Sequence, residues 1–269
     1  MVGFTHLGQI NQLRNRPMSK DTIPTKTAPP LEKKTTVGNY FVSNYPPFSF
    51  WKQEDIPDYR KALGHPPKPN TELGIYVHIP FCRKRCHFCY FRVYTDKDSK
   101  EIRNYIDALL SELRLYAKEH FIGGRKPKFV YFGGGTPSYL SESQLRELTD
   151  GMKEILPWDE VEEVTFECEP GTLREKKLQV LRDIGVTRLS LGVENFDDHI
   201  LELNGRAHHG KEIVRAYEFA QGLGFPQINI DLIAGMVEET EKNWKKCIER
   251  TREMAPDSVT IYQMEVPYN

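Results

Sequence analysis

Six β-like runs alternate with longer helix-like segments from about residue 74 to the end of this 269-residue chain. We predict strands at 74–79, 128–132, 163–168, 188–194, 227–233 and 258–266. Strands that alternate with helices pair in parallel through right-handed crossovers. The pattern therefore predicts an α/β fold, a partial (β/α)6 barrel, with a doubly wound open sheet as the alternative.

Capping signals and glycines mark the predicted helix ends. The predicted capping boxes are Asp98 with Glu101, Ser141 with Gln144, and Thr172 with Glu175. The glycines expected just beyond helices are Gly123, Gly185 and Gly222.

One face of several predicted strands is polar. Its members are Tyr76, His78, Thr165, Glu167, Arg188, Ser190, Glu194, Asn229 and Asp231. Strand side chains alternate between two faces, so helices can cover the apolar set while the polar set lines a cavity. Because unpaired carboxylates are costly in a dry core, we expect this cavity to hold a polar ligand. We predict Glu167, Glu194 and Asp231 at or near the carboxyl edge of the sheet, on its concave side.

Residues 1–70 have a different composition from the rest of the chain. They hold ten of the 18 prolines, and Lys+Arg outnumber Asp+Glu there by ten to five. Such sequence buries too little apolar surface to offset its ordering entropy. We expect a partly disordered N-terminal extension, loosest at 1–38, with an aromatic arm at 40–51, before a core domain at 71–269. Since no covering helix follows the sixth predicted strand, we expect a truncated chain.

Charge and cysteine content restrict the partners and the compartment. With 37 Lys+Arg against 38 Asp+Glu, the formal net charge is −1, so we expect no nucleic acid or membrane partner. No apolar run approaches the roughly 20 residues of a membrane span, and we expect no signal peptide. The chain has five cysteines, an odd number, and three of them lie in one short stretch. This pattern predicts a reducing compartment, the cytoplasm.

The chemically most specific stretch is residues 76–91, YVHIPFCRKRCHFCYF. Its cysteines, Cys82, Cys86 and Cys89, have the spacing C-x3-C-x2-C. Three thiolates on one short loop can bind three irons of a cubane [4Fe–4S] cluster, which leaves the fourth iron open to a small molecule. The spacing therefore predicts an iron–sulfur site.

Two other interpretations of these cysteines stay open: a structural zinc knuckle and three unrelated buried thiols. A zinc knuckle needs a fourth Cys or His ligand, and His87, between two of the cysteines, would reach the same metal only under strain. Cys168 and Cys247 fall in a predicted strand and helix, where buried inert thiols are expected. His208 and His209 follow a predicted helix, which favours surface positions.

A run of glycines, Gly133 to Gly135, follows the second predicted strand and leads into Thr136 and Pro137. Ligands bind at the carboxyl edge of the sheet in parallel α/β folds. Consecutive glycines let the backbone approach a ligand closely and present its N–H and C=O groups. This run therefore predicts a backbone contact to a ligand one βα unit after the cysteines.

Six motifs occur in the order YVHIPFC, GGGTPS, FECEPGT, RLSLGVENF, NGRAH and INIDLIAGM. Together with the cysteines they resemble the radical S-adenosylmethionine (SAM) superfamily, and within it the oxygen-independent coproporphyrinogen III oxidase family. That family includes haem chaperones and radical SAM methyltransferases. The resemblance spans about residues 74–267. It implies a radical SAM barrel, a [4Fe–4S] cluster whose open iron chelates SAM, and an electron donor such as flavodoxin or ferredoxin.

The resemblance also assigns site residues by motif position. Contacts to the cluster-bound SAM fall on Tyr76, Gly134 and Glu167, of which Tyr76 and Glu167 are the catalytic candidates. Contacts to a second SAM, which some members bind, fall on Phe88, Gly135, Thr136, Glu194, Arg206, Asp231 and Met264. The alternatives are ion pairing of the three carboxylates with Arg188 or Arg206, and plain packing of Tyr76 and Met264.

Two positions depart from the family pattern. Phe91 stands where established coproporphyrinogen oxidases carry another cysteine, and Glu194 stands where the family usually has Gln. An acid in place of an amide removes two hydrogen-bond donors and can add a negative charge. Both departures put the coproporphyrinogen reaction itself in doubt.

Overall, the resemblance implies an oxidoreductase that cleaves SAM reductively and abstracts hydrogen from an organic small molecule such as a tetrapyrrole. Methyl transfer and haem delivery by a chaperone are the alternatives within the family. A cluster- or haem-carrying protein without radical chemistry is the alternative outside it. The two departures favour another substrate than coproporphyrinogen, with methyl transfer as the first alternative.

Overall fold

The computed structural model describes residues 52–89 and 91–264. The expected loose segment at 1–38, the aromatic arm at 40–51 and the expected chain end beyond the sixth strand lie outside the described residues. The proposed division between residues 1–70 and 71–269 stays a prediction.

Six strands form one sheet in which every neighbouring pair is parallel. Their bounds are β1 Leu73–Ile79, β2 Pro127–Gly134, β3 Glu163–Cys168, β4 Arg188–Glu194, β5 Gln227–Ala234 and β6 Ser258–Gln263. The strand order β1-β2-β3-β4-β5-β6 follows the sequence, so the chain winds in one direction only. The predicted strands and the (β/α)6 order are therefore confirmed, whereas the doubly wound alternative is wrong.

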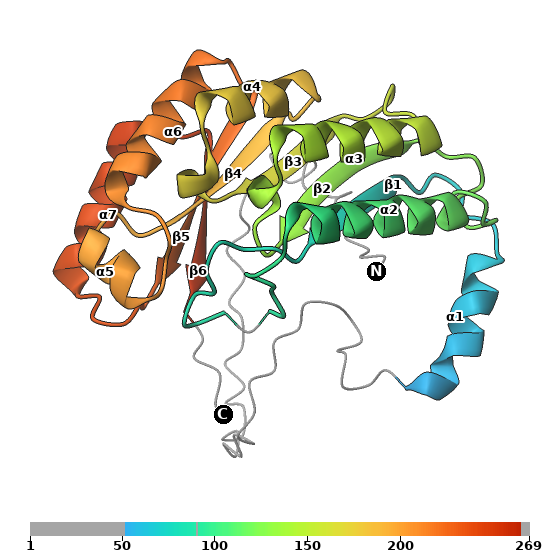
Figure 1. The fold of residues 1–269 in the computed structure, drawn as a ribbon, viewed down its shortest axis with the longest axis horizontal. Coiled ribbons are helices and arrows are strands. Elements are labelled where there is room, and N and C mark those ends of the chain that lie inside the picture. Colours follow the sequence, from blue (N-terminus) through green and yellow to red (C-terminus); the bar gives the residue numbers. More distant parts are fainter. Residues whose placement is uncertain (1–51, 90, 265–269) are drawn as a thin grey trace, which may run out of the picture. The chain divides into compact units, whose positions relative to one another are not determined.

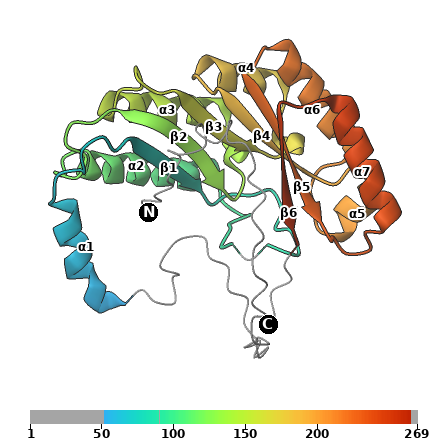
Figure 2. The ribbon, with the colours of Figure 1, turned by 180° about the vertical axis from the view of Figure 1, so that it is seen from behind.

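Helices connect the strands and follow the outer side of the sheet (Figure 1 and Figure 2). The α-helices are α1 Ile56–Leu63, α2 Ser99–Tyr116, α3 Glu142–Ile155, α4 Glu175–Asp183, α5 Asp198–Leu203, α6 Gly210–Gly222 and α7 Glu241–Met254. The short 3-10 helices are η2 Gln53–Asp55, η3 Pro137–Tyr139 and η4 Pro170–Thr172. Helix α1 lies in the predicted N-terminal extension, 1–70, which we expected to be partly disordered. No helix among the described residues combines the length and apolar character that crossing a membrane requires.

The apolar face of the sheet packs against the helices, as the alternation predicts. The strands contribute Val77, Ile79, Val130, Phe132, Val164, Phe166, Leu189, Leu191, Ile228, Ile230 and Leu232 to one buried core cluster. The helices contribute Ile102, Ile106, Leu145, Leu148, Leu181 and Ile213 to the same cluster. Since burial of each such side chain stabilises the fold by about 2 kcal/mol, this face needs no ligand.

Two of the three predicted capping boxes are confirmed, those of Asp98 and Ser141. The third is wrong because Arg174, not Thr172, occupies the N-cap position of α4, without a side-chain capping hydrogen bond. The hydroxyl of Thr172 donates instead to the carbonyl of Glu169 at 2.8 Å. Gly222 is the last residue of α6 rather than the residue beyond it. The left-handed turn falls on Gly224, with φ 66°.

Candidate functional site

The cysteine loop, residues 80–94, begins where β1 ends and returns to the same place. The Cys82 N–H donates to the Tyr94 carbonyl at 3.0 Å, and the Tyr94 N–H donates to the Pro80 carbonyl at 2.8 Å. The N–H groups of Gly135 and Thr136 donate to the Ile79 and Phe81 carbonyls, each at 2.8 Å. These bonds place the cysteine loop beside the glycine run at the carboxyl edge of β1 and β2.

The three thiols of the loop fall within a stretch of eight residues, and the charge of Cys86 acts on both Cys82 and Cys89. Burial raises the pKa of both Cys82 and Cys89. Two donors face the sulfurs: Thr136 Oγ1 lies 3.3 Å from Cys82 Sγ, and an Arg206 nitrogen lies 3.3 Å from Cys86 Sγ. Neighbouring thiols with hydrogen-bond donors fit a cluster in which each thiolate binds its own iron.

A single metal ion fits the loop less well. Within residues 52–89 and 91–264, no three His, Cys, Asp or Glu side chains converge closely enough to hold one ion. His87 donates its N–H to the Asn204 carbonyl at 3.1 Å, and its Nδ1 lies 3.0 Å from the Leu203 carbonyl. A Cβ on Gly205 would lie 2.9 Å from the His87 ring. The ring therefore packs on the end of α5, and the zinc knuckle finds no support in the described residues.

The glycine run leaves no space for side chains. A Cβ on Gly134, where φ is 116°, would lie 2.8 Å from the His78 ring, and one on Gly135 would lie 3.0 Å from Cys82 Sγ. A Cβ on Gly133 would lie 3.1 Å from both the Tyr76 ring and a Glu167 oxygen. Real Cβ atoms tolerate such contacts only if the neighbours move, so glycine is what lets these four side-chain groups approach the strand.

Glu167 is held by neutral donors rather than by a cation. The Tyr131 hydroxyl donates to it at 2.6 Å, and the Gly134 N–H donates at 3.2 Å. Burial raises the Glu167 pKa to about 7, and the nearby charge of Asp231 adds to the increase. Tyr76, 44% exposed, stacks on Tyr131 with ring centroids 5.9 Å apart. The alternative of an ion pair is therefore wrong for Glu167, and Tyr131 is a site residue that the sequence reasoning missed.

Glu194 and Arg206 form the ion pair that we considered as the alternative. An Arg206 nitrogen lies 3.3 Å from Glu194 Oε1 and donates to the Gly192 carbonyl at 2.9 Å. Glu194 has φ 63° at an irregularity in the β4–β5 register. Burial raises its pKa to about 7, although Arg206 opposes this increase. The strained backbone and the buried pair are typical of a position that the surrounding structure holds in place.

Asp231 lies in the middle of β5 and takes part in a polar network that crosses three strands. It accepts hydrogen bonds from Ser190 at 2.7 Å and from Asn229 at 2.8 Å. Asn229 in turn accepts from Ser258 at 2.8 Å. Burial raises the Asp231 pKa. In the sheet register Glu167 is level with Ser190 and Asn229, and Asp231 is opposite Gly192, two residues further toward the carboxyl edge. Glu167 is the last but one residue of β3 and Glu194 the last of β4, so all three carboxylates lie at or near that edge, as predicted.

Phe88 and Met264 share one apolar environment. Both pack against an apolar cluster of Ile200, Ile233 and Met236. The plain packing that we considered for Met264 is thus observed, and Phe88 shares it.

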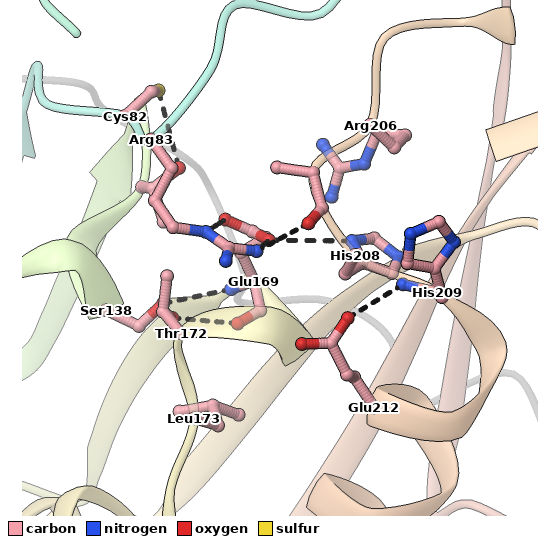
Figure 3. A network of polar contacts seen from close by, with 12 residues as sticks. Cys82, Arg83, Ser138, Glu169, Thr172, Leu173, Arg206, His208, His209 and Glu212 are labelled. Atoms are coloured by element: carbon pink, nitrogen blue, oxygen red, sulfur yellow. Dashed lines mark hydrogen bonds and ion pairs between the residues drawn. The ribbon is translucent and has the colours of Figure 1, made fainter. Parts of the chain in front are cut away.

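Glu169, at the end of β3, is the centre of a polar network that the sequence reasoning missed (Figure 3). The Arg83 guanidinium binds both Glu169 oxygens and also donates to the Ala207 carbonyl at 2.7 Å. His208 Nδ1 lies 3.8 Å from Glu169 Oε1. Burial alone would raise the Glu169 pKa, but His208 and Arg83 outweigh burial and hold it at about 2. The sequence does show a charged residue, Arg83, directly after Cys82 and an acid, Glu169, in the motif FECEPGT. Nothing in the sequence indicates that these two residues are partners.

For two cysteines and two histidines outside the loop, the sequence predicts whether the side chain is buried or exposed. Cys168 and Cys247 are buried, and burial raises the pKa of each thiol, so the prediction of inert thiols is consistent with the structure. The surface prediction is wrong for His208, which is 0% exposed because its ring lies between Glu169 and the Val193 carbonyl. The prediction is confirmed for His209, whose side chain is 46% exposed.

Known proteins resemble this chain over most of its described part. A haem chaperone, HemW, of Bacillus subtilis strain 168 is 36% identical over 193 residues, which cover 71% of this chain and 50% of that protein. The oxygen-independent coproporphyrinogen III oxidase of Escherichia coli strain K12 is 31% identical over 194 residues, covering 72% and 42%. The chain thus spans about half the length of the curated relatives it matches.

A solved structure and a family description agree with these relatives. The coproporphyrinogen III oxidase HemN from Escherichia coli superposes with a TM-score of 0.71 at 30% identity, covering 81% of this chain and 48% of that one. The description "Radical SAM superfamily" matches residues 76–251, which is more than half of the chain. This chain therefore belongs to the radical SAM superfamily, whose members use a [4Fe–4S] cluster and S-adenosylmethionine.

Proposed function

We propose that this chain is the radical SAM domain of an enzyme resembling oxygen-independent coproporphyrinogen III oxidase, in which Cys82, Cys86 and Cys89 hold the cluster. The observation that carries the proposal is the position of the cysteine loop, which meets the glycine run at the carboxyl edge of the sheet. Glu167 lies beside the same glycines, because it accepts a hydrogen bond from the Gly134 N–H. It makes no ion pair with any of the described residues.

The residues around Glu167 would bind and orient the SAM. When bound, the reduced cluster supplies the electron that cleaves the sulfonium of SAM. Gly134 can offer its carbonyl to the methionine end of SAM, while Glu167 can accept hydrogen bonds from it. With a pKa of about 7, Glu167 can also hold or release a proton near neutral pH. The phenol of Tyr76 lies on the same face, within the aromatic pair that it forms with Tyr131.

The residues that we assign to a second SAM fall into two groups. The first surrounds the sulfurs and the buried ion pair and comprises Gly135, Thr136, Glu194 and Arg206. The second comprises Phe88 and Met264, which could contact the apolar parts of a ligand, and Asp231, which could accept hydrogen bonds from ribose hydroxyls. Arg206 already forms an ion pair with Glu194. A second SAM would therefore have to bind Arg206 together with Glu194 or replace Glu194 as its partner.

We propose a small organic molecule other than coproporphyrinogen as the substrate, because Phe91 and Glu194 replace a cysteine and a glutamine of the family. Methyl transfer is the first alternative reaction. The electron donor would be a flavodoxin or ferredoxin in a reducing compartment such as the cytoplasm.

A haem chaperone is the second candidate function. It is supported by the identity to the Bacillus subtilis haem chaperone, 36%, which exceeds the 31% identity to the Escherichia coli oxidase over a similar length. A chaperone would bind haem and release little product from SAM.

The test is an anaerobic assay of the protein after cluster reconstitution. The protein is given SAM and a reductant, alone and with coproporphyrinogen III or haem. Release of 5′-deoxyadenosine supports the enzyme, and transfer of a labelled methyl group from SAM supports methyl transfer. Tight haem binding with negligible 5′-deoxyadenosine supports the chaperone. Efficient formation of protoporphyrinogen IX would contradict the altered substrate.

A further inference from the structure

Two separate parts of the chain contact the cysteine loop through hydrogen bonds and an ion pair. The segment 203–208, between α5 and α6, contacts the loop through the Asn204 carbonyl, the Arg206 side chain and the Ala207 carbonyl. The second part is Glu169 at the end of β3, which binds the Arg83 guanidinium. Arg83 follows Cys82 directly, so both parts act on the stretch that carries the cysteines.

Glu169 is itself fixed before it meets Arg83. Its N–H donates to the Ser138 hydroxyl at 2.9 Å, and its carbonyl accepts from the Thr172 hydroxyl at 2.8 Å. The Ser138 carbonyl in turn accepts from the Lys177 ammonium at 2.8 Å. The carboxylate is only 8% exposed, whereas the Arg83 side chain is 35% exposed. The carboxylate is therefore the fixed partner, and the arginine and its loop are the parts that it orders.

A glycine makes room for this contact. A Cβ on Gly171 would lie 2.1 Å from an Arg83 guanidinium nitrogen and 2.9 Å from Glu169 Oε1. Any side chain at this position would push the guanidinium away from the Glu169 carboxylate, which it contacts in Figure 3. The displaced group is the end of a flexible side chain, so such a change would disturb the contact with little effect on the fold.

We propose that Glu169 and Arg83 are positioning residues that hold the cysteine loop, and Cys82 in particular, in the conformation that receives the cluster. This inference rests on the proposed function of the loop. The guanidinium joins three segments that are distant in sequence: the cysteine loop, the end of β3 and the Ala207 carbonyl. Because Ala207 follows Arg206, the same contact also fixes the backbone from which Arg206 reaches Cys86.

The experiment measures how fast each cysteine reacts with iodoacetamide in the protein without cluster, by peptide mass spectrometry. The two test variants are Glu169→Gln, which removes the charge, and Gly171→Ala, which keeps the charge but displaces the guanidinium. The matched controls are Asp183→Asn, which breaks the exposed Arg146 ion pair, and Gly222→Ala, where a Cβ meets nothing within 4 Å. Buried Cys168 and Cys247 report on the fold in every variant.

We expect both test variants to increase the alkylation rate of Cys82 roughly tenfold, the size of one charged hydrogen bond. The rates of Cys168 and Cys247 should stay unchanged, as should all rates in the two controls. After reconstitution, both test variants should also lose iron to a chelator several-fold faster than the wild type. Wild-type rates at Cys82 in both variants would overturn the inference. So would equal acceleration at Cys168 and Cys247, since that indicates a general loss of stability.

The same measurements separate this inference from the proposed function. If the wild-type protein takes up no cluster, the proposed function fails, whereas the alkylation result still decides whether Glu169 and Arg83 order the loop. If the wild type binds a cluster and the variants lose it no faster, the positioning role fails while the proposed function stands.

Discussion

Two carboxylates at the end of β3, Glu167 and Glu169, lie two residues apart and have opposite environments. Glu169 binds the Arg83 guanidinium, and its pKa is held at about 2. Among residues 52–89 and 91–264, the donors to Glu167 are neutral, the Tyr131 hydroxyl and the Gly134 N–H, and burial raises its pKa to about 7. An ion pair thus compensates the charge of Glu169, whereas the described part of the chain gives Glu167 no ion pair and only a minor opposing effect from the charge of Arg188.

The difference separates a structural role from a ligand-binding role. A buried acid that already has its cation contributes to folding and has little capacity left for a ligand. A buried acid that has no cation is destabilising when ionised, so its presence is better explained by what binds there. On these grounds we propose that Glu169 supports the cysteine loop and that Glu167 binds a cofactor.

The largest effect is expected in the region that Glu169 supports. Replacing Cys82, Cys86 or Cys89 by Ala should abolish uptake of a stable [4Fe–4S] cluster and all SAM cleavage, because three thiolates are the minimum that the loop offers. Iron analysis and visible absorption after anaerobic reconstitution measure this loss. Cys168→Ala and Cys247→Ala are the controls and should bind about four irons. Equal iron in the Cys82→Ala protein would show that the cluster is held elsewhere.

The next effect concerns the free energy of unfolding in Glu169→Gln. The wild-type pKa of about 2 lies below the ordinary 4.5, so ionised Glu169 stabilises the fold above pH 4.5 and this contribution is lost as the pH falls towards 2. We expect the free energy of unfolding of the variant to be lower than that of the wild type by on the order of 2 kcal/mol above pH 4.5. This value allows for solvent screening at Arg83, which is partly exposed. Urea unfolding of the cluster-free protein across this range measures it. A constant difference between wild type and variant down to pH 2 would contradict the assignment.

Glu167→Gln should show the opposite pH dependence. The folded pKa of about 7 lies above the ordinary 4.5, so the protonated acid contributes stability below pH 4.5 that is lost as the pH rises through 7. A neutral amide avoids this loss at the expense of one hydrogen bond. We therefore expect a flatter pH profile and a gain of about 1 kcal/mol above pH 7. The same urea series tests it, and a parallel profile for wild type and variant would refute it.

The smallest effect is expected at an ion pair of the same chemistry on the surface. Arg146 and Asp183 join α3 and α4 at 2.7 Å, with side chains 46% and 38% exposed. Because solvent screens such a pair, Asp183→Asn should change the free energy of unfolding by less than about 0.5 kcal/mol. A loss as large as that of Glu169→Gln would mean that burial is not what distinguishes the two pairs.

The sequence predicts the sheet well because the information is local. Each strand carries its own alternation of polar and apolar side chains, and the capping boxes of Asp98 and Ser141 need only residues three positions away. The exception is Thr172, whose hydroxyl bonds to Glu169 and Ser138 instead of capping α4. There, a tertiary contact outweighs a local signal.

The candidate site is less predictable because its contacts are distant in sequence. Arg83 meets Glu169, 86 residues away, and Ala207, 124 residues away, and no local pattern specifies either partner. His208 follows a short helix, where exposure is usual, yet the same network buries it. Tyr131 was within reach of the sequence, since it is opposite Tyr76 in the β1–β2 register and therefore on the polar face.

The most direct test of the central claim uses electron paramagnetic resonance of the reconstituted, reduced protein before and after SAM is added. If Cys82, Cys86 and Cys89 hold a cluster with one open iron beside Glu167, the spectrum of the reduced [4Fe–4S] cluster should change when SAM binds. The change should be lost in Glu167→Ala but kept in Cys168→Ala. A wild-type spectrum that SAM leaves unchanged, with about four irons bound, would contradict the account.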